Sequence, residues 1–101
     1  MRIIAIGVLR NYCLRHSEAE QALKAWISEV RHARWSQPAD IKARYRNASI
    51  LKNRRVVFNI KGNDYRLMVA VAFYHQSVFI KFIGTHAQYD KIDAETIELK
   101  E

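Results

Sequence analysis

Three β-type segments in the second half of the chain restrict the fold more than any other feature. Valine, isoleucine, phenylalanine and tyrosine dominate residues 54–61, 64–74 and 77–84, as is typical of strands. The dipeptides Gly62-Asn63 and His75-Gln76 separate these segments and are predicted to form tight turns. The pattern therefore predicts two consecutive antiparallel hairpins.

The tight turns predict which residues face one another across each hairpin. Lys61 would face Asp64, and Tyr74 would face Ser77. Because side chains alternate between the two faces of a sheet, counting outward from the turns assigns every strand residue to a face. The first face, here called the core face, is almost wholly apolar and would carry Val56, Phe58, Ile60, Tyr65, Leu67, Val69, Val71, Phe73, Val78, Ile80 and Phe82. The opposite face, here called the second face, would carry Arg55, Val57, Asn59, Lys61, Arg66, Met68, Ala70, Phe79, Lys81, Ile83 and Thr85.

Helical patterns precede these strands. Residues 3–6 are predicted to form a short strand and residues 8–16 a helix. Ser17 and Glu20 have capping-box spacing, and apolar residues then recur at three- and four-residue steps to about His32, which predicts a second helix. A third, shorter helix would begin at Pro38 and end near Arg44. The order predicts an α+β fold in which helices pack on one face of an antiparallel sheet.

Composition indicates a compact basic protein. The 101 residues suffice for one domain spanning residues 1–101, and the hydrophobic fraction of 50% argues against disorder. A formal net charge of +7 favours a polyanionic partner, which could be a nucleic acid, an acidic protein or an anionic membrane. The single cysteine, Cys13, is predicted to be a core residue of the first helix. One cysteine and no apolar run of transmembrane length together predict a cytoplasmic protein without a membrane partner.

The second face is predicted to gather polar groups at one end of the sheet. Asn59 would lie opposite Arg66 in the first hairpin, and Arg66 opposite Thr85 in the second, with Lys81 on the same face. A strand arginine is usually only a solvated residue of a sheet face. The predicted proximity of several such groups favours a functional site here.

A short helix is predicted to complete this site. Thr85 and Gln88 have capping-box spacing, so a helix should open at Thr85 with His86 in its first turn. Tyr89 and Asp90, three and four residues later, would lie on the same side of that helix as His86. Free backbone N–H groups at the helix start would favour a phosphate. An arginine, a histidine and a tyrosine are thus expected to converge.

Three segments resemble one known family. They are PADIKA at residues 38–43, VFNIKGNDYRL at residues 57–67 and GTHAQYDK at residues 84–91. In order and spacing they are similar to the HigB-type toxins of the RelE-like superfamily, and the resemblance covers most of the chain. It implies a sheet-and-helix fold and metal-independent cleavage of messenger RNA, usually on the ribosome.

The resemblance also implies partners and site residues. The partner would be a helix-turn-helix antitoxin similar to HigA, and the chain would meet operator DNA only through the complex with that antitoxin. Arg66 matches the sheet arginine that related toxins place at the scissile phosphate. His86 and Tyr89 match the Thr-His-x-x-Tyr segment that carries active-site groups of the family.

The residue types suit RNA cleavage through the 2′-hydroxyl. Arg66 would stabilise charge on the phosphorane, because a guanidinium offers a planar fork of donors to phosphate oxygens. His86 would act as acid or base, since the unperturbed pKa of histidine is about 6.5. Tyr89 would transfer a proton or stack on a base, and Asp90 would orient His86. The candidates for RNA contact are Arg55, Asn59, Lys61, Asn63, Lys81 and Lys91. No cofactor and no metal are expected.

Two other functions remain open from the sequence. A non-catalytic basic module that binds RNA or the ribosome would explain the charge and the polar face equally well, but not the convergence of arginine, histidine and tyrosine. An interaction domain whose basic face docks an acidic protein is the third possibility.

Overall fold

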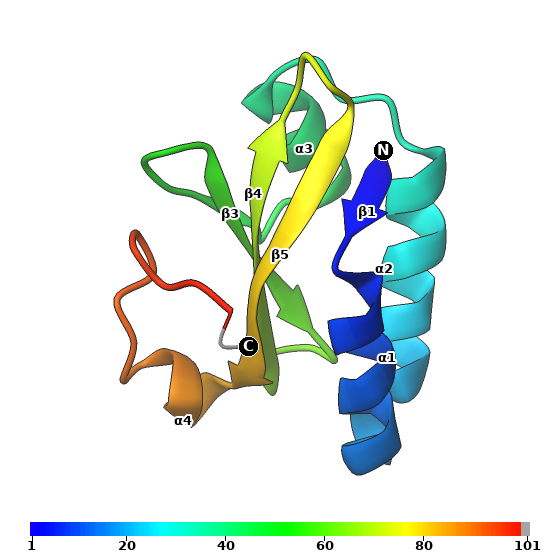
Figure 1. The fold of residues 1–101 in the computed structure, drawn as a ribbon, viewed down its shortest axis with the longest axis vertical. Helices are drawn as coiled ribbons and strands as arrows, with labels where there is room; N and C mark the ends of the chain where they lie inside the picture. The colour runs from blue at the N-terminus through cyan, green and yellow to red at the C-terminus, as the bar shows by residue number, and fades with distance from the viewer. Residues whose placement is uncertain (100–101) are drawn as a thin grey trace.

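The described part of the chain is built around one sheet. The computed structural model describes residues 1–99, and within them five strands pair in the order β1-β5-β4-β3-β2 (Figure 1). The strands are β1 (Arg2–Ile4), β2 (Ser49–Ile50), β3 (Arg55–Ile60), β4 (Tyr65–Ala72) and β5 (Ser77–Thr85). The three predicted strands of the second half are confirmed as β3, β4 and β5, whereas the two-residue β2 was not predicted.

The positions of the helices agree closely with those predicted from the spacing of apolar residues. They are α1 (Ile6–Arg15), α2 (Glu20–His32), α3 (Pro38–Arg44) and α4 (His86–Tyr89). The predicted capping box at Ser17 is wrong, because a 3-10 turn, Ser17–Ala19, precedes α2 and no side chain caps the helix. No helix among residues 1–99 is both long and apolar enough to span a membrane.

The α+β class is confirmed, but the sheet is mixed. β1 pairs in parallel with β5, with Ile3 opposite Val78. The chain leaves β1 directly into α1, because Ala5 adopts a left-handed conformation with φ 71° and turns the backbone away. The predicted strand over residues 3–6 was therefore placed too late. A parallel pairing of three residues has no local signal, since its partner lies more than 70 residues away.

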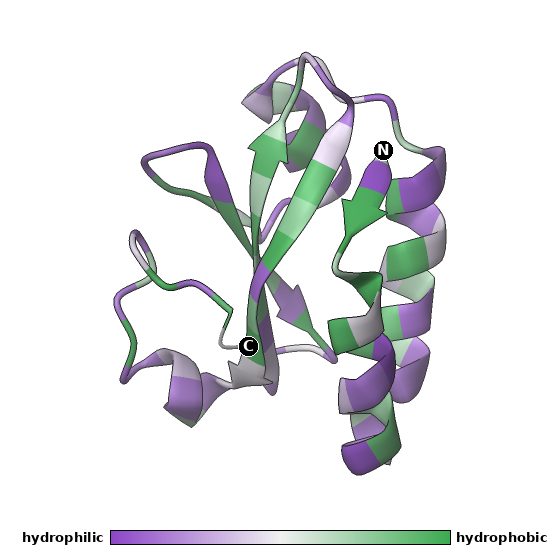
Figure 2. Ribbon diagram, in the orientation of Figure 1, coloured by the Kyte–Doolittle hydropathy of each residue, from purple (hydrophilic) through white to green (hydrophobic). Residues whose placement is uncertain are grey.

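The helices bury the core face. Apolar residues of α2 and α3, including Trp26 and Ile41, are buried against the sheet. The rings of Trp26 and Phe58 meet edge to face with centroids 5.4 Å apart, a favoured aromatic geometry. Hydrophobic residues dominate β4 and β5, and hydrophilic residues dominate α4 (Figure 2). Cys13 is buried in this core, as predicted.

The first hairpin has the predicted register. Ile60 pairs with Tyr65, which is the alignment that follows from Lys61 facing Asp64. The chain reverses through residues 61–64, where Lys61 and Gly62 have positive φ angles of 53° and 63°. Glycine adopts this left-handed conformation without a steric penalty, so the Gly-Asn signal located the turn correctly.

The second hairpin pairs differently from the prediction. Ala72 pairs with Ser77, so residues 73–76 form the connection in place of a two-residue turn. Farther along, the register shifts by one residue between Val69, which pairs with Ile80, and Met68, which pairs with Phe82. The extra residue of this β-bulge is Lys81.

After the bulge, the side chains at the end of β5 lie on the opposite faces of the sheet from those predicted. Ile83 was predicted on the second face but packs against the core. Phe82 was predicted on the core face but lies beside Tyr89, with ring centroids 6.3 Å apart. Both errors have one cause, because an alternation count that passes a bulge is wrong by one residue.

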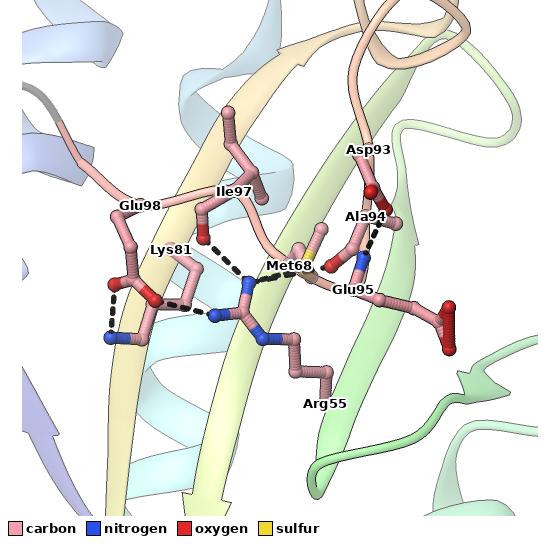
Figure 3. A network of polar contacts seen from close by, with 8 residues as sticks. All are labelled: Arg55, Met68, Lys81, Asp93, Ala94, Glu95, Ile97 and Glu98. Atoms are coloured by element: carbon pink, nitrogen blue, oxygen red, sulfur yellow. Dashed lines mark hydrogen bonds and ion pairs between the residues drawn. The ribbon is translucent and has the colours of Figure 1, made fainter.

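A C-terminal segment crosses the second face. Residues 93–99, here called the C-terminal segment, pass over the strands that carry Arg55, Met68 and Lys81 (Figure 3). Arg55 is 6% exposed and Met68 is fully buried. The second face is therefore partly covered, and not open as predicted. Lys100 and Glu101 lie outside the described residues.

Candidate active site

Arg66 lies near the start of β4, beside the β3–β4 turn. Asn59 pairs with Arg66 as predicted, but the partner on β5 is Gly84 and not Thr85, because the longer connection shifts the register by two residues and the bulge restores one of them. The guanidinium of Arg66 donates to Oδ1 of Asn63 at 2.7 Å and to the carbonyl oxygen of Asn63 at 3.0 Å. The turn that Asn63 belongs to therefore orients the arginine.

Helix α4 begins where the capping box predicted. Thr85 Oγ1 accepts from the N–H of Gln88 at 3.2 Å, and Gln88 Oε1 accepts from the N–H of Thr85 at 2.9 Å. The N–H of His86 donates to the carbonyl oxygen of Asp64 at 3.0 Å. Because these three N–H groups already have partners in the chain, the expectation that they would bind a phosphate is not supported.

The bond between His86 and Asp64 has a second consequence. Asp64 belongs to the same turn as Asn63, which holds Arg66. The start of α4 is thereby tied to the turn that positions the arginine. Residues from two distant parts of the sequence form one unit at this end of the sheet.

His86 is paired with Asp90 one helical turn later. Nδ1 of the imidazole lies 3.1 Å from Oδ2 of Asp90, and the two side chains are 47% and 60% exposed. The Asp90 carboxylate accepts a hydrogen bond from a protonated Nδ1, which leaves Nε2 as the nitrogen for proton exchange. The predicted orienting contact is present.

Tyr89 is the last residue of α4 and lies within electrostatic reach of Arg66. Partial burial raises the pKa of Tyr89 above its ordinary value, and the positive charge of Arg66 acts in the opposite direction. Tyr89 is therefore a neutral phenol near pH 7 and has a proton to donate. Its ring also packs beside Phe82.

The four residues that the sequence predicts to be catalytic are Arg66, His86, Tyr89 and Asp90, and we call them the catalytic cluster. It combines a planar cationic donor, an oriented imidazole and a neutral phenol within one turn-and-helix unit. Such a set can neutralise a phosphoryl group and move protons next to it. Among the described residues, no group of three or more histidine, cysteine, aspartate or glutamate side chains is placed to hold a metal ion.

The remaining candidates for RNA contact divide into two groups. Lys61 and Lys91 are exposed, one in the β3–β4 turn and the other just after α4. Arg55 and Lys81, by contrast, do not project from an open face. Arg55 is buried under the C-terminal segment, and Lys81 is paired with Glu98 at 2.6 Å. Alternation predicted their face correctly but could not predict that another segment covers it.

A groove of about 670 Å³ adjoins the cluster. It is lined by α1, the end of β5, α4 and the chain after it, and the C-terminal segment. Tyr12 of α1 and His16, the residue after α1, stack there with ring centroids 4.1 Å apart, and Phe82 and Lys91 also line the groove. Side-chain alternation did not reveal this groove, because it placed Phe82 on the core face.

Comparison with known proteins adds independent information. A family model described as HigB_toxin, RelE-like toxic component of a toxin-antitoxin system, matches residues 19–92. The chain is 25% identical to a protein named mRNA interferase HigB from Escherichia coli O6:H1, with the whole of both chains covered. It is also 25% identical to the mRNA interferase toxin HigB of Escherichia coli K12, over 89% of this chain and 88% of that protein.

Proposed function

Because this chain belongs to the HigB toxin family, the RelE-like toxic component of toxin–antitoxin systems, we propose that it is an endoribonuclease that cleaves messenger RNA. The names of its relatives, which are called mRNA interferases, support this proposal. The main structural support is the backbone hydrogen bond from His86 to Asp64. It joins the residue that carries the oriented imidazole to the turn that holds Arg66.

The proposed reaction uses the nucleophile that RNA already contains. A base removes the proton of the 2′-hydroxyl, and the 2′-oxygen attacks the adjacent phosphorus. The bond from phosphorus to the 5′-oxygen then breaks, and an acid protonates that oxygen. The products are a 2′,3′-cyclic phosphate and a 5′-hydroxyl. The proposed reaction involves no oxidation or reduction, and it requires no metal ion.

Each member of the catalytic cluster has a role in this scheme. Arg66 donates to the non-bridging oxygens of the phosphorane, where negative charge builds up. His86 transfers a proton through Nε2, with Asp90 holding the ring by Nδ1. Tyr89, a neutral phenol, serves as the second proton-transfer group or stacks on a base. Lys61, Lys91, Asn59 and Asn63 contact the RNA backbone.

The proposal extends to partners and setting. Residues 1–101 act as one toxin domain in the cytoplasm, where the messenger RNA is. The RNA is cut on the ribosome, and a helix-turn-helix antitoxin similar to HigA neutralises the chain. Operator DNA is contacted only through the complex with that antitoxin. The net charge of +7 is compatible with such polyanionic or acidic partners.

The decisive experiment compares cleavage with and without ribosomes. The purified chain is added to a messenger RNA free in solution and to the same RNA on programmed ribosomes, with and without a chelator. We expect cuts on the ribosome that persist in chelator and end in a cyclic phosphate. Tight RNA binding without any cut would instead support the non-catalytic module. Loss of cleavage in chelator would contradict the metal-free scheme.

A further inference from the structure

The C-terminal segment is fastened to the sheet through a buried charge. The guanidinium of Arg55, a β3 residue, donates to the carbonyl oxygens of Ala94 at 3.3 Å and Ile97 at 2.5 Å, and to Glu98 at 2.5 Å (Figure 3). Its side chain is only 7% exposed. A buried guanidinium requires such partners, because an uncompensated buried charge is strongly unfavourable.

Glu98 occupies the position of a bridging anion. One carboxylate oxygen accepts from Arg55 at 2.5 Å, and the other accepts from Lys81 at 2.6 Å. Two cations therefore share one carboxylate, each through a different oxygen. A phosphodiester also has two charged oxygens that can accept from two cations at once. The Glu98 side chain is itself 58% exposed, so an anion can reach this position from solvent.

This anion position lies on the same face as the catalytic cluster. Arg55 pairs with Ala70, and Arg66 lies four residues before Ala70 on the same strand. At a rise of about 3.3 Å per residue, the two arginine positions are separated by about 13 Å along the sheet. Met68 lies between them, under the C-terminal segment. A single strand of RNA held at Arg66 can continue along this face toward Arg55 only where it displaces the C-terminal segment.

We propose that Arg55 and Lys81 form a second phosphate-binding site for the RNA strand, and that Glu98 occupies this site in the free protein. The inference rests on the proposed function, because that function supplies single-stranded RNA as the ligand. RNA and the C-terminal segment then compete for the same two cations. Removal of the Glu98 charge should favour RNA without touching the catalytic cluster.

The first test measures binding, so that cleavage is not needed. The probe is a fluorescein-labelled single-stranded RNA whose 2′-hydroxyls are methylated and which therefore cannot be cut. Glu98→Gln is compared with Glu95→Gln, since Glu95 lies in the same segment but points away from both cations (Figure 3). We expect Glu98→Gln to bind about two- to fivefold more tightly, as for loss of a competing exposed ion pair, and Glu95→Gln to bind like the parent.

The second test identifies the cations. In the Glu98→Gln background, Lys81→Ala should lower the slope of log affinity against log salt by about 0.7, the value for one phosphate contact on a single strand. Lys24→Ala is the matched control, because Lys24 lies on α2 and pairs with Glu20. Lys24→Ala should leave the slope of log affinity against log salt unchanged.

Two results would overturn the proposal. If Glu98→Gln binds RNA no more tightly than Glu95→Gln while its melting temperature falls, the network is only a structural clamp. If Lys81→Ala and Lys24→Ala lower the salt slope equally, the effect is one of general charge. The proposed cleavage activity can be refuted separately. In that case Glu98→Gln would still bind RNA more tightly, but no variant would cut RNA on programmed ribosomes.

Discussion

Oδ2 of Asp90, the C-cap of α4, lies 3.1 Å from Nδ1 of His86, the first residue of that helix. The contact gives the imidazole one defined orientation at the end of the sheet. Both partners are about half exposed, 47% and 60%, so solvent screens the pair. The pair therefore acts mainly through the position of the ring.

Asp90→Asn should slow cleavage modestly. Since an exposed pair contributes little energy, we expect a fall in kcat of roughly twofold to tenfold. Asp64→Asn is the control, because it removes a nearby carboxylate but keeps the carbonyl oxygen that binds the N–H of His86. Single-turnover cleavage on programmed ribosomes measures both variants. Equal losses in the two would show that Asp90 acts only through general charge.

Arg66 and His86 should account for most of the rate. Arg66→Ala should reduce the cleavage rate by about 10²–10³-fold, the typical cost of one donor to developing charge. His86→Ala should reduce it by about 10²–10⁴-fold through loss of proton transfer. Thermal melts should show little change, because His86 is exposed and Arg66 is only partly buried. Variants that are folded and cleave like the parent would refute these roles.

Arg66→Lys separates charge from geometry. Lysine keeps the positive charge but loses the planar fork of donors, so the rate should stay well below that of the parent. Full activity of Arg66→Lys would mean that the site requires only a positive charge.

Gly84→Ala should disturb the site through packing. A Cβ atom at Gly84 would lie 2.6 Å from Cζ of Phe82 and 2.7 Å from Oε1 of Gln88. The added methyl group would displace Gln88 from the Thr85 capping box, and loss of such a cap costs about 1 kcal/mol. We expect a lower free energy of unfolding and slower cleavage, measured by urea titration and by the ribosome assay.

Gly7→Ala is the matched control for this substitution. Gly7 lies in α1, and a Cβ atom there would meet nothing within 4 Å. Alanine in a helix is favoured over glycine by about 0.5–1 kcal/mol. The variant should be at least as stable as the parent and equally active. A comparable loss in both variants would rule out the proposed contact with Gln88.

The stability of the chain should respond to alkaline pH through Tyr65. A hydrogen bond from its hydroxyl to Glu18 raises the pKa of Tyr65 from about 10 to about 12. A raised pKa in the folded state means that the stabilisation is complete below pH 10 and is lost as pH rises to about 12. The difference in free energy of unfolding between the parent and Tyr65→Phe should shrink over that interval. A difference that stays constant from pH 9 to 12 would contradict this assignment.

Local rules predicted much of the fold and part of the site. Alternation located β3, β4 and β5, and the Gly62-Asn63 turn set the register that places Asn59 opposite Arg66. Capping-box spacing located the start of α4, and the four-residue step from His86 to Asp90 predicted their contact. Each of these relationships joins residues close in sequence or across one tight turn, so short-range stereochemistry is enough to determine it.

The remaining features were decided by tertiary structure. The bulge at Lys81 turned Phe82 toward Tyr89 and placed Gly84 opposite Arg66. No residue pattern in the sequence predicted this bulge. Arg55 was expected on an open face, but Glu98 covers it from 43 residues away in the sequence. The sequence by itself determined where α1 to α4 and β3 to β5 form and, up to the bulge, which residues share a face of the sheet. Which surfaces stay exposed depends on segments that meet only when the chain is folded, because burial and charge pairing act between residues regardless of their separation along the chain.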